Sequence, residues 1–175
     1  PTMSTSIQDT APLKIGLVSI SDRASSGTYQ DLGIPAMADW LDRALTSTWL
    51  GNSRLIPDEQ EAISQTLCEL ADDVGCHLVL TTGGTGVTPR DLTPEGTAPL
   101  LTARLEGIEA QIRAYGLTKT PLSGLSRGLV GVTSREATGA LVVNAPGSRG
   151  GVKDAVDVVG PLVPHVLEQL GGGDH

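Results

Sequence analysis

The feature that most constrains the fold of this chain is a series of short apolar segments separated by helical patterns. The two clearest segments, Leu13–Ile20 and residues 77–82, are apolar without alternation. Strands that are buried on both faces of a sheet have this pattern. Further strands are predicted at residues 53–56, 129–134 and 139–145. The chain therefore has the strand content of an open sheet with buried central strands.

Amphipathic helical patterns lie between these segments. The first follows a polar loop at residues 21–33, and its apolar residues recur with a period of 3.6. These residues are Ile34, Met37, Ala38, Leu41 and Leu45. A second helix is predicted to begin at Asp58, with Glu61 at the spacing of a capping box, and to end before Gly75. Both helices connect predicted strands, as in an α/β protein.

Three more helices are predicted in the second half of the chain. The first begins after Thr93, the next covers residues 105–115, and the last covers residues 152–170. Pro161 and Pro164 should kink or split the last one. Strands that alternate with helices indicate an open, largely parallel sheet with helices on both faces. We expect one domain at residues 13–170, a disordered segment at residues 1–12 and a flexible tail at residues 171–175.

Composition and charge exclude several classes of function. The formal net charge is −8 and only four aromatic residues are present, which is unlike a nucleic-acid-binding surface. Cys68 and Cys76 form no CxxC pair, so a structural zinc site is not expected. No apolar run approaches the roughly 20 residues of a membrane span, and residues 1–12 do not resemble a signal peptide. We therefore expect a cytoplasmic protein that binds small molecules.

The strongest local signal is a glycine-rich turn between a predicted strand and a predicted helix. It consists of Gly83, Gly84, Thr85 and Gly86. Backbone amides in such a turn can hold phosphate oxygens. Arg90 adds a forked cation and Asp91 a carboxylate, which together with phosphate would suit Mg²⁺. A tight turn without a ligand also explains the glycines. The segment matches neither the Walker A motif nor the dinucleotide GxGxxG motif.

Three other strand ends carry polar residues. Asp58 follows the second strand and could share a metal with Asp91, although a helix N-cap would also explain it. Ser21 and Asp22 follow the first strand, where ordinary loop chemistry is the alternative. The last strand leads into Asn144, Pro146, Gly147 and Ser148, which could instead form only a rigid turn. Because ligands bind at the carboxyl edge of open α/β sheets, we expect these loops to converge on one anion-binding pocket.

The motifs that carry these residues are LVSISDRASSG, RLIPDEQ, HLVLTTGGTG, RDLTPE and NAPGS, and together they resemble the bacterial Mog proteins. The resemblance extends to the MoaB proteins and the G domain of gephyrin, and it covers residues 14–168. It implies a molybdopterin-binding fold with a mixed, mostly parallel sheet, assembled as a trimer. It also implies transfer of AMP from ATP to the terminal phosphate of molybdopterin, with Mg²⁺ and with release of pyrophosphate. A molybdate-insertion enzyme would be the partner in that pathway.

The resemblance also implies roles for individual residues. Asp58 and Asp91 match the two functionally critical acids of the family, which makes them the candidates for catalysis and for the metal. The glycine-rich turn matches the position of nucleotide or pterin phosphates. The LSR and N-x-PGS segments, which are expected near the ligand, correspond to Ser126, Arg127, Asn144, Pro146, Gly147 and Ser148. From the residues alone, an exposed surface side chain is the simpler explanation of Arg127.

Three departures from the family keep alternatives open. Ala145 stands where NLPG has leucine. Arg149, Gly150 and Gly151 stand where the family often has a Pro and a Lys after PGS, and Lys153 comes slightly later. The chain is also compact between Gly139 and the last helix, unlike longer Mog proteins. A MoaB-like molybdopterin carrier without adenylyl transfer is therefore the main alternative. An NAD-type nucleotide enzyme and a purely structural oligomer are weaker ones.

Overall fold

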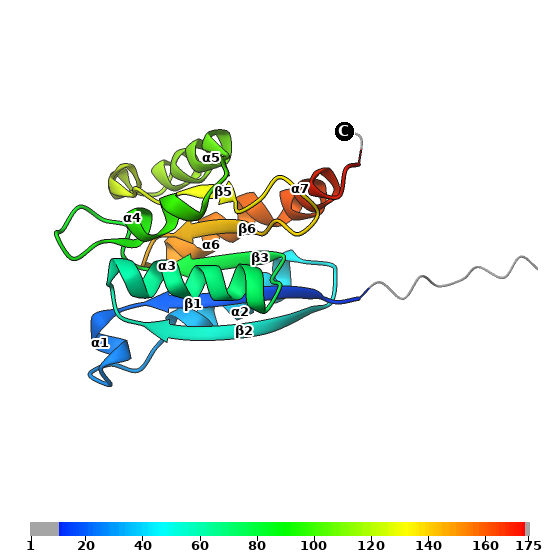
Figure 1. The fold of residues 1–175 in the computed structure, drawn as a ribbon. Coiled ribbons are helices and arrows are strands. Elements are labelled where there is room, and N and C mark those ends of the chain that lie inside the picture. The colour runs from blue at the N-terminus through cyan, green and yellow to red at the C-terminus, as the bar shows by residue number, and fades with distance from the viewer. Residues whose placement is uncertain (1–10, 174–175) are drawn as a thin grey trace, which may run out of the picture.

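The computed structural model describes residues 11–173 as an α/β protein with one sheet (Figure 1). The predicted N-terminal segment at residues 1–12 therefore lies largely outside the described residues, as do the last two residues of the predicted tail. Within the part that the structure describes, no helix is long and apolar enough to cross a membrane.

The sheet has six strands in the order β2-β1-β3-β6-β5-β4. Their bounds are β1 Leu13–Ile20, β2 Trp49–Ile56, β3 Leu78–Thr82, β4 Ala103–Arg104, β5 Val130–Val132 and β6 Leu141–Ala145. The first four strands in this order are parallel, whereas β5 is antiparallel to both of its neighbours. The expectation of a mixed, mostly parallel sheet is confirmed. Strand β1 lies between β2 and β3, so a topological switch point lies at the carboxyl ends of β1 and β3.

Helices cover both faces of this sheet (Figure 1). They are α1 Asp22–Ser25, α2 Gly33–Ala44, α3 Gln60–Cys68, α4 Thr93–Thr97, α5 Glu106–Leu117, α6 Arg149–Val159 and α7 Val163–Leu170. Helices α2, α5, α6 and α7 pack with Leu17 and Leu80 in one core cluster, and α3 packs with Val18 and Val79 in the other. Successive residues of β1 and β3 thus enter opposite cores, which explains why these strands show no polar alternation.

Strand β1 has the predicted bounds, and β3, β5 and β6 are one to three residues shorter than predicted. Strands β2 and β4 differ more from the prediction. Strand β2 begins at Trp49, four residues before the predicted start at residue 53. The prediction missed its first residues because β2 is an edge strand, in which exposed residues lie between less exposed ones. Strand β4 was not predicted, since two residues carry no pattern. The polar loop at residues 21–33 contains the short helix α1, which Ser21 caps by accepting a hydrogen bond from the Ala24 amide.

The C-terminal helical region is split as the prolines predicted. Helix α6 ends at Val159, the 3-10 turn Gly160–Leu162 follows, and α7 begins at Val163. Helix α6 starts at Arg149, not at residue 152, because the Ser148 hydroxyl caps it by accepting the Gly151 amide. The predicted loop before it is therefore shorter, and the first turn of α6 lies at the edge of the sheet that carries the polar motifs.

Candidate functional site

The glycine-rich turn after β3 has a backbone that only glycine adopts easily. Gly83 and Gly84 have φ angles of +96° and +67°. A Cβ at Gly83 would lie 2.2 Å from the carbonyl oxygen of Ile20, so the turn packs directly on the end of β1. Thr93 holds the turn from the other side, because its amide and its hydroxyl donate to the carbonyls of Gly84 and Gly83 at 3.0 and 2.9 Å.

Asp58 does not cap the helix that follows it. Helix α3 begins at Gln60, and its N-cap residue Glu59 makes no side-chain cap, so the predicted N-cap and capping box are wrong. The Asp58 carboxylate instead turns toward the glycine-rich turn, where Oδ1 accepts the Leu92 amide at 3.0 Å. Oδ2 lies 2.8 Å from the position that a Cβ on Gly84 would occupy. Asp58 therefore supports the turn and is only 6% exposed.

Burial raises the pKa of the Asp58 carboxyl above its ordinary value. The Leu92 amide lowers this pKa, whereas the charges of Asp91 and Asp22 raise it further. A buried carboxylate beside two other carboxylates has the electrostatic environment in which a cation binds favourably.

Asp22 is held by two partners and links the first loop to the site. Its Oδ1 accepts the Asp58 amide at 2.9 Å, and its Oδ2 accepts two guanidinium N–H groups of Arg90 at 2.8 and 3.1 Å. The Arg90 hydrogen bonds, followed by that of the Asp58 amide, lower the pKa of Asp22. Arg90, which we expected to face phosphate, pairs with Asp22 and remains exposed.

Asp91 lies on the other side of the glycine-rich turn. Its Oδ2 accepts the amide and the hydroxyl of Thr88 at 3.0 and 2.8 Å. The same oxygen lies 2.6 Å from where a Cβ on Gly86 would be. Asp58 and Asp91 thus lie on either side of the four-residue glycine-rich turn. We expected the loops that carry them to converge at one edge of the sheet.

Each of the two carboxylates leaves one oxygen for a divalent cation that phosphate would complete. In each, one oxygen is held by the hydrogen bonds described above, while no hydrogen bond from residues 11–173 reaches Oδ2 of Asp58 or Oδ1 of Asp91. Neither of these oxygens is among the fully buried atoms that lack a partner, but of the two residues only Asp91 lines one of the neighbouring cavities. Among the described residues, no cluster of three or more His, Cys, Asp or Glu side chains could hold a metal alone. A cation here would need substrate oxygens, as Mg²⁺ commonly does.

Arg127 is not a freely solvated side chain. Its guanidinium donates to the carbonyls of Gly86 and Asp91 at 2.7 and 2.8 Å and to Glu95 at 2.6 Å. Its backbone amide donates to the Thr85 carbonyl. Arg127 therefore ties the glycine-rich turn to Asp91 and α4, and its cation is used for positioning these groups.

We expect Arg127→Met to lower the free energy of unfolding by about 1–3 kcal/mol, because two carbonyls and Glu95 lose a charged donor. The Arg127–Glu95 ion pair contributes little to this free energy, because the Arg127 side chain is 37% exposed and solvent screens its charge. Urea unfolding measures the change, with Arg135→Met at an exposed position as the control. Arg127→Lys should restore little, since one ammonium cannot replace the planar fork. Wild-type stability in Arg127→Met would contradict this role.

Asn144 lies beneath the turn. It is 2% exposed, its Oδ1 accepts the Leu129 amide, and its amide group donates to Thr81 and Thr97. All of these partners are protein groups, and Asn144 does not line the neighbouring cavities. Its contacts join β6 to β3 and α4, so it supports the site and does not face a ligand.

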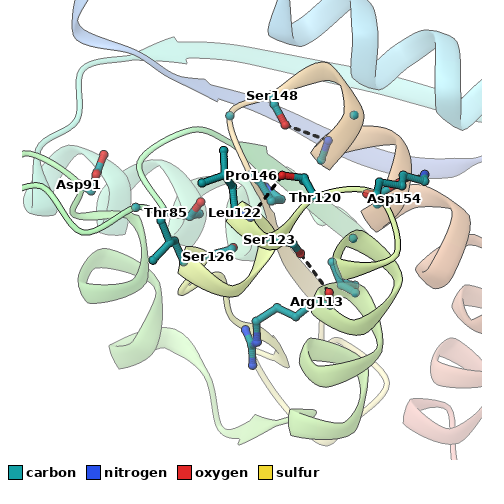
Figure 2. A pocket seen from close by; sticks show the side chains of 18 of the residues that line it. Thr85, Asp91, Arg113, Thr120, Leu122, Ser123, Ser126, Pro146, Ser148 and Asp154 are labelled. Atoms are coloured by element: carbon teal, nitrogen blue, oxygen red, sulfur yellow. Dashed lines mark hydrogen bonds and ion pairs between the residues drawn. The ribbon is translucent and has the colours of Figure 1, made fainter.

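A cavity of about 550 Å³ opens beside the glycine-rich turn (Figure 2). It is lined by the predicted site residues Gly84, Thr85, Gly86, Asp91, Ser126, Pro146, Gly147 and Ser148. Its other wall comes from α5 and the 3-10 turn Pro121–Leu125, neither of which we predicted to contribute. That wall includes Arg113, Lys119 and Leu122. No strand-end pattern marks these residues, because they enter the cavity from a helix and the turn after it.

A second cavity, of about 580 Å³, lies on the other side of Gly147. It is lined by Ser21, Gly83 and Tyr29, among others, at the switch point between β1 and β3. Gly147 lines both cavities, and a Cβ on it would lie 3.4 Å from the Cα of Gly83. The two cavities therefore lie on either side of the contact between the glycine-rich turn and the loop after β6, and they share Gly147 in their walls.

The sequence profile of a family described as "Probable molybdopterin binding domain" matches residues 16–165. The chain belongs to this family. Within it, the chain is 50% identical over 157 residues to a protein of Escherichia coli K12 named molybdopterin adenylyltransferase, covering 87% of this chain and 78% of that one. A protein of the same name from Haemophilus influenzae is 49% identical over 158 residues, covering 90% of this chain and 78% of the other.

Solved structures of family members share the fold described above. The Mog protein of Mycobacterium ulcerans has a TM-score of 0.81 at 34% identity, and the alignment covers 93% of this chain and 99% of that one. The MoaB protein of Thermus thermophilus has a TM-score of 0.80 at 37% identity, with coverages of 91% and 97%. The expected molybdopterin-binding fold is therefore confirmed, as is the resemblance to the Mog and MoaB proteins.

Proposed function

We propose that this chain is a molybdopterin adenylyltransferase of molybdenum cofactor biosynthesis. The observation that carries the proposal is the pair of adjacent cavities that share Gly147, next to a turn flanked by Asp58 and Asp91. A transferase that joins two substrates needs two adjoining sites that meet at the reacting atoms. The names of relatives that are 50% and 49% identical to the chain support the same activity.

The reaction requires little acid–base chemistry from the protein. An oxygen of the terminal molybdopterin phosphate attacks the α-phosphorus of ATP, and the bond from that phosphorus to the bridging oxygen breaks. Pyrophosphate leaves with the electron pair. The nucleophile is already an anion, so the barrier is largely the repulsion between charged groups. The site must therefore hold two anions in line and offset their charge.

The residues of this chain supply the alignment. Residues of the glycine-rich turn and of the first turn of α6 line the first cavity, and free amides in these segments would donate to phosphate. Arg127 and Thr93 keep the glycine-rich turn in place. Asp91, through Oδ1, and Asp58, through Oδ2, would hold Mg²⁺ together with substrate phosphate. When bound, that ion would neutralise negative charge on the reacting phosphates.

Release of pyrophosphate on mixing the purified protein with ATP, MgCl₂ and molybdopterin tests the proposal. We expect release only when both substrates are present, with formation of adenylyl-molybdopterin. A MoaB-like carrier would bind molybdopterin without releasing pyrophosphate, and that result would overturn the proposed activity. The family resemblance further suggests a homotrimer in the cytoplasm that passes its product to a molybdate-insertion enzyme. Light scattering on the purified protein tests the trimer.

Asp58→Asn should lower activity and change the pH dependence of stability. Because burial raises the pKa of Asp58 above its usual 3.8, the folded protein holds this proton more tightly than the unfolded chain. The resulting stabilisation is fully present at pH values below the pKa that Asp58 has in the unfolded chain. It is lost as the pH rises through the higher pKa that Asp58 has in the folded protein. Asn can still accept the Leu92 amide but does not titrate. The variant should therefore match the wild type in acid and exceed its stability at neutral pH.

Urea unfolding of both proteins between pH 3 and pH 7 measures this difference. A stability gap that stays constant, or that narrows as the pH rises, would refute the raised pKa. Asp39→Asn, an exposed substitution on α2, serves as the control and should show no such trend.

A further inference from the structure

One loop of the candidate site is held at both ends by a single guanidinium. Residues 86–91 connect the glycine-rich turn to the segment before α4. Arg127 donates from Nε to the Gly86 carbonyl at 2.7 Å and from Nη2 to the Asp91 carbonyl at 2.8 Å. One side chain from a distant segment therefore bridges the two ends of this loop and fixes the main chain that carries the Asp91 carboxylate.

The Arg127 guanidinium is itself held by Glu95. Nη1 of Arg127 donates to Oε1 of Glu95 at 2.6 Å, so this bond uses the one nitrogen that neither carbonyl uses. Glu95 lies in the first turn of α4, which Thr93 joins to the glycine-rich turn. Because a guanidinium is planar and rigid, holding its third nitrogen sets the plane in which the other two meet the carbonyls.

Two carboxylates lie close enough to compete for this guanidinium. The Arg127 hydrogen bond lowers the pKa of Glu95, whereas burial and the charge of Asp91 raise this pKa. Arg127 contacts the side chain of Glu95 but only the main chain of Asp91. The Asp91 oxygen Oδ1 receives no hydrogen bond from residues 11–173. A guanidinium released by Glu95 would therefore find a second carboxylate in the same loop.

The Arg127–Glu95 pair is not explained by stability alone. Both side chains are partly exposed, so solvent screens the attraction between them. Oε2 of Glu95 is fully buried and receives no hydrogen bond from residues 11–173, which costs free energy. Neither residue lines either cavity, whereas Asp91 lies at one side of the first cavity (Figure 2). The pair thus reaches the cavity through Asp91.

We propose that Glu95 is a positioning residue for the adenylyl transfer. It holds the Arg127 guanidinium on the main chain of Asp91 and away from the Asp91 carboxylate, which keeps Oδ1 free for the reaction. The inference rests on the proposed function and adds to it a residue that lines neither cavity. Without the Glu95 carboxylate, the guanidinium turns toward Oδ1 and neutralises the charge that the reaction needs.

Turnover of Glu95→Gln tests this role, because the variant keeps the size of the side chain and removes its charge. We expect kcat to fall about tenfold or more, since a small displacement of an aligned group lowers a rate strongly. KM for both substrates should change little. Glu95→Asp keeps the charge and should retain more turnover. In an Arg127→Met background, adding Glu95→Gln should change kcat by less than about twofold, because the residue through which Glu95 acts is missing.

Glu106→Gln is the matched control. Glu106 also lies in the first turn of a helix, α5, and pairs with an arginine, Arg104, at 3.7 Å, but its side chain is exposed. This variant should keep the wild-type kcat. Urea unfolding should show nearly wild-type stability for Glu95→Gln. A loss of stability that accounts for the whole loss of turnover would show that Glu95 only supports the fold, and the proposal would be overturned.

The NMR signal of the Arg127 Nε–H group gives a readout that needs no substrate. Its disappearance in Arg127→Met assigns it. We expect this signal to shift in Glu95→Gln and to stay unchanged in Glu106→Gln. An unchanged signal in Glu95→Gln would show that Glu95 does not set the position of the guanidinium, which overturns the proposal.

The two measurements distinguish a failure of this inference from a failure of the proposed function. If the wild type transfers AMP and Glu95→Gln transfers it equally fast, the inference fails and the proposed function stands. If the wild type transfers no AMP, the proposed function fails, whereas a shifted Arg127 signal still supports the hold of Glu95 on Arg127.

Discussion

Asp91→Asn should reduce adenylyl transfer by about 10²–10³-fold, the range seen when one preorganised charge-stabilising group is removed. The amide can still accept a hydrogen bond from Thr88, so the loop before α4 should keep its shape. What the variant loses is the charge of the oxygen that we propose lies beside the reacting phosphates. Molybdopterin binding should be largely intact, because the rest of the cavity wall is unchanged.

Steady-state pyrophosphate release and equilibrium binding of molybdopterin measure the two effects separately. Asp39→Asn on α2 should retain wild-type turnover. Unchanged turnover in Asp91→Asn would remove Asp91 from the mechanism. Loss of molybdopterin binding together with turnover would instead make it a residue of ground-state binding.

Gly84→Ala should impair both the fold and the activity. The φ angle of +67° is strained for alanine, and the new Cβ would lie 2.2 Å from Oγ1 of Thr93 and 2.8 Å from Oδ2 of Asp58. Strain of this kind costs about 1–3 kcal/mol. The substitution also covers this Asp58 oxygen and moves the turn, and a displacement of about 1 Å can lower a rate by about 10²-fold.

Gly107→Ala on α5 provides a matched comparison. A Cβ at Gly107 meets nothing within 4 Å, so its stability should stay the same or rise by up to about 1 kcal/mol. Thermal unfolding and turnover of the two variants measure the contrast. Equal stability of Gly84→Ala and the wild type would show that the turn relaxes and that glycine is not required there.

The fold was predictable because its central strands are short apolar runs that carry their own signal. Strand β1 has the expected bounds, and the pattern at α2 appears in the structure as a helix packed in the core. Strand β4 has only two residues and pairs with a distant segment, so no local pattern could reveal it. Edge strand β2 was found only in part, since its alternating exposure hides the apolar run.

The sequence predicted where the residues of the candidate site lie better than it predicted what each residue does. Asp58 and Asp91 flank the same turn, but the local pattern at Asp58 indicated a helix cap that the structure does not have. Arg127 and Asn144 bind protein groups from distant segments, which sequence spacing cannot show. Lys119 and Asp154 line the first cavity but carry no motif. Their ion pair forms because α5 packs on α6.

The position of Arg127 has a consequence for how activity is lost on heating. It joins the loop after β3 to the segment that enters β5, a strand of three residues beside a strand of two. Such short elements near one edge of the sheet open at a lower free energy than the longer central strands. Local opening at this edge would release the glycine-rich turn while the parallel strands stay protected from amide exchange. Inactivation would then precede global denaturation.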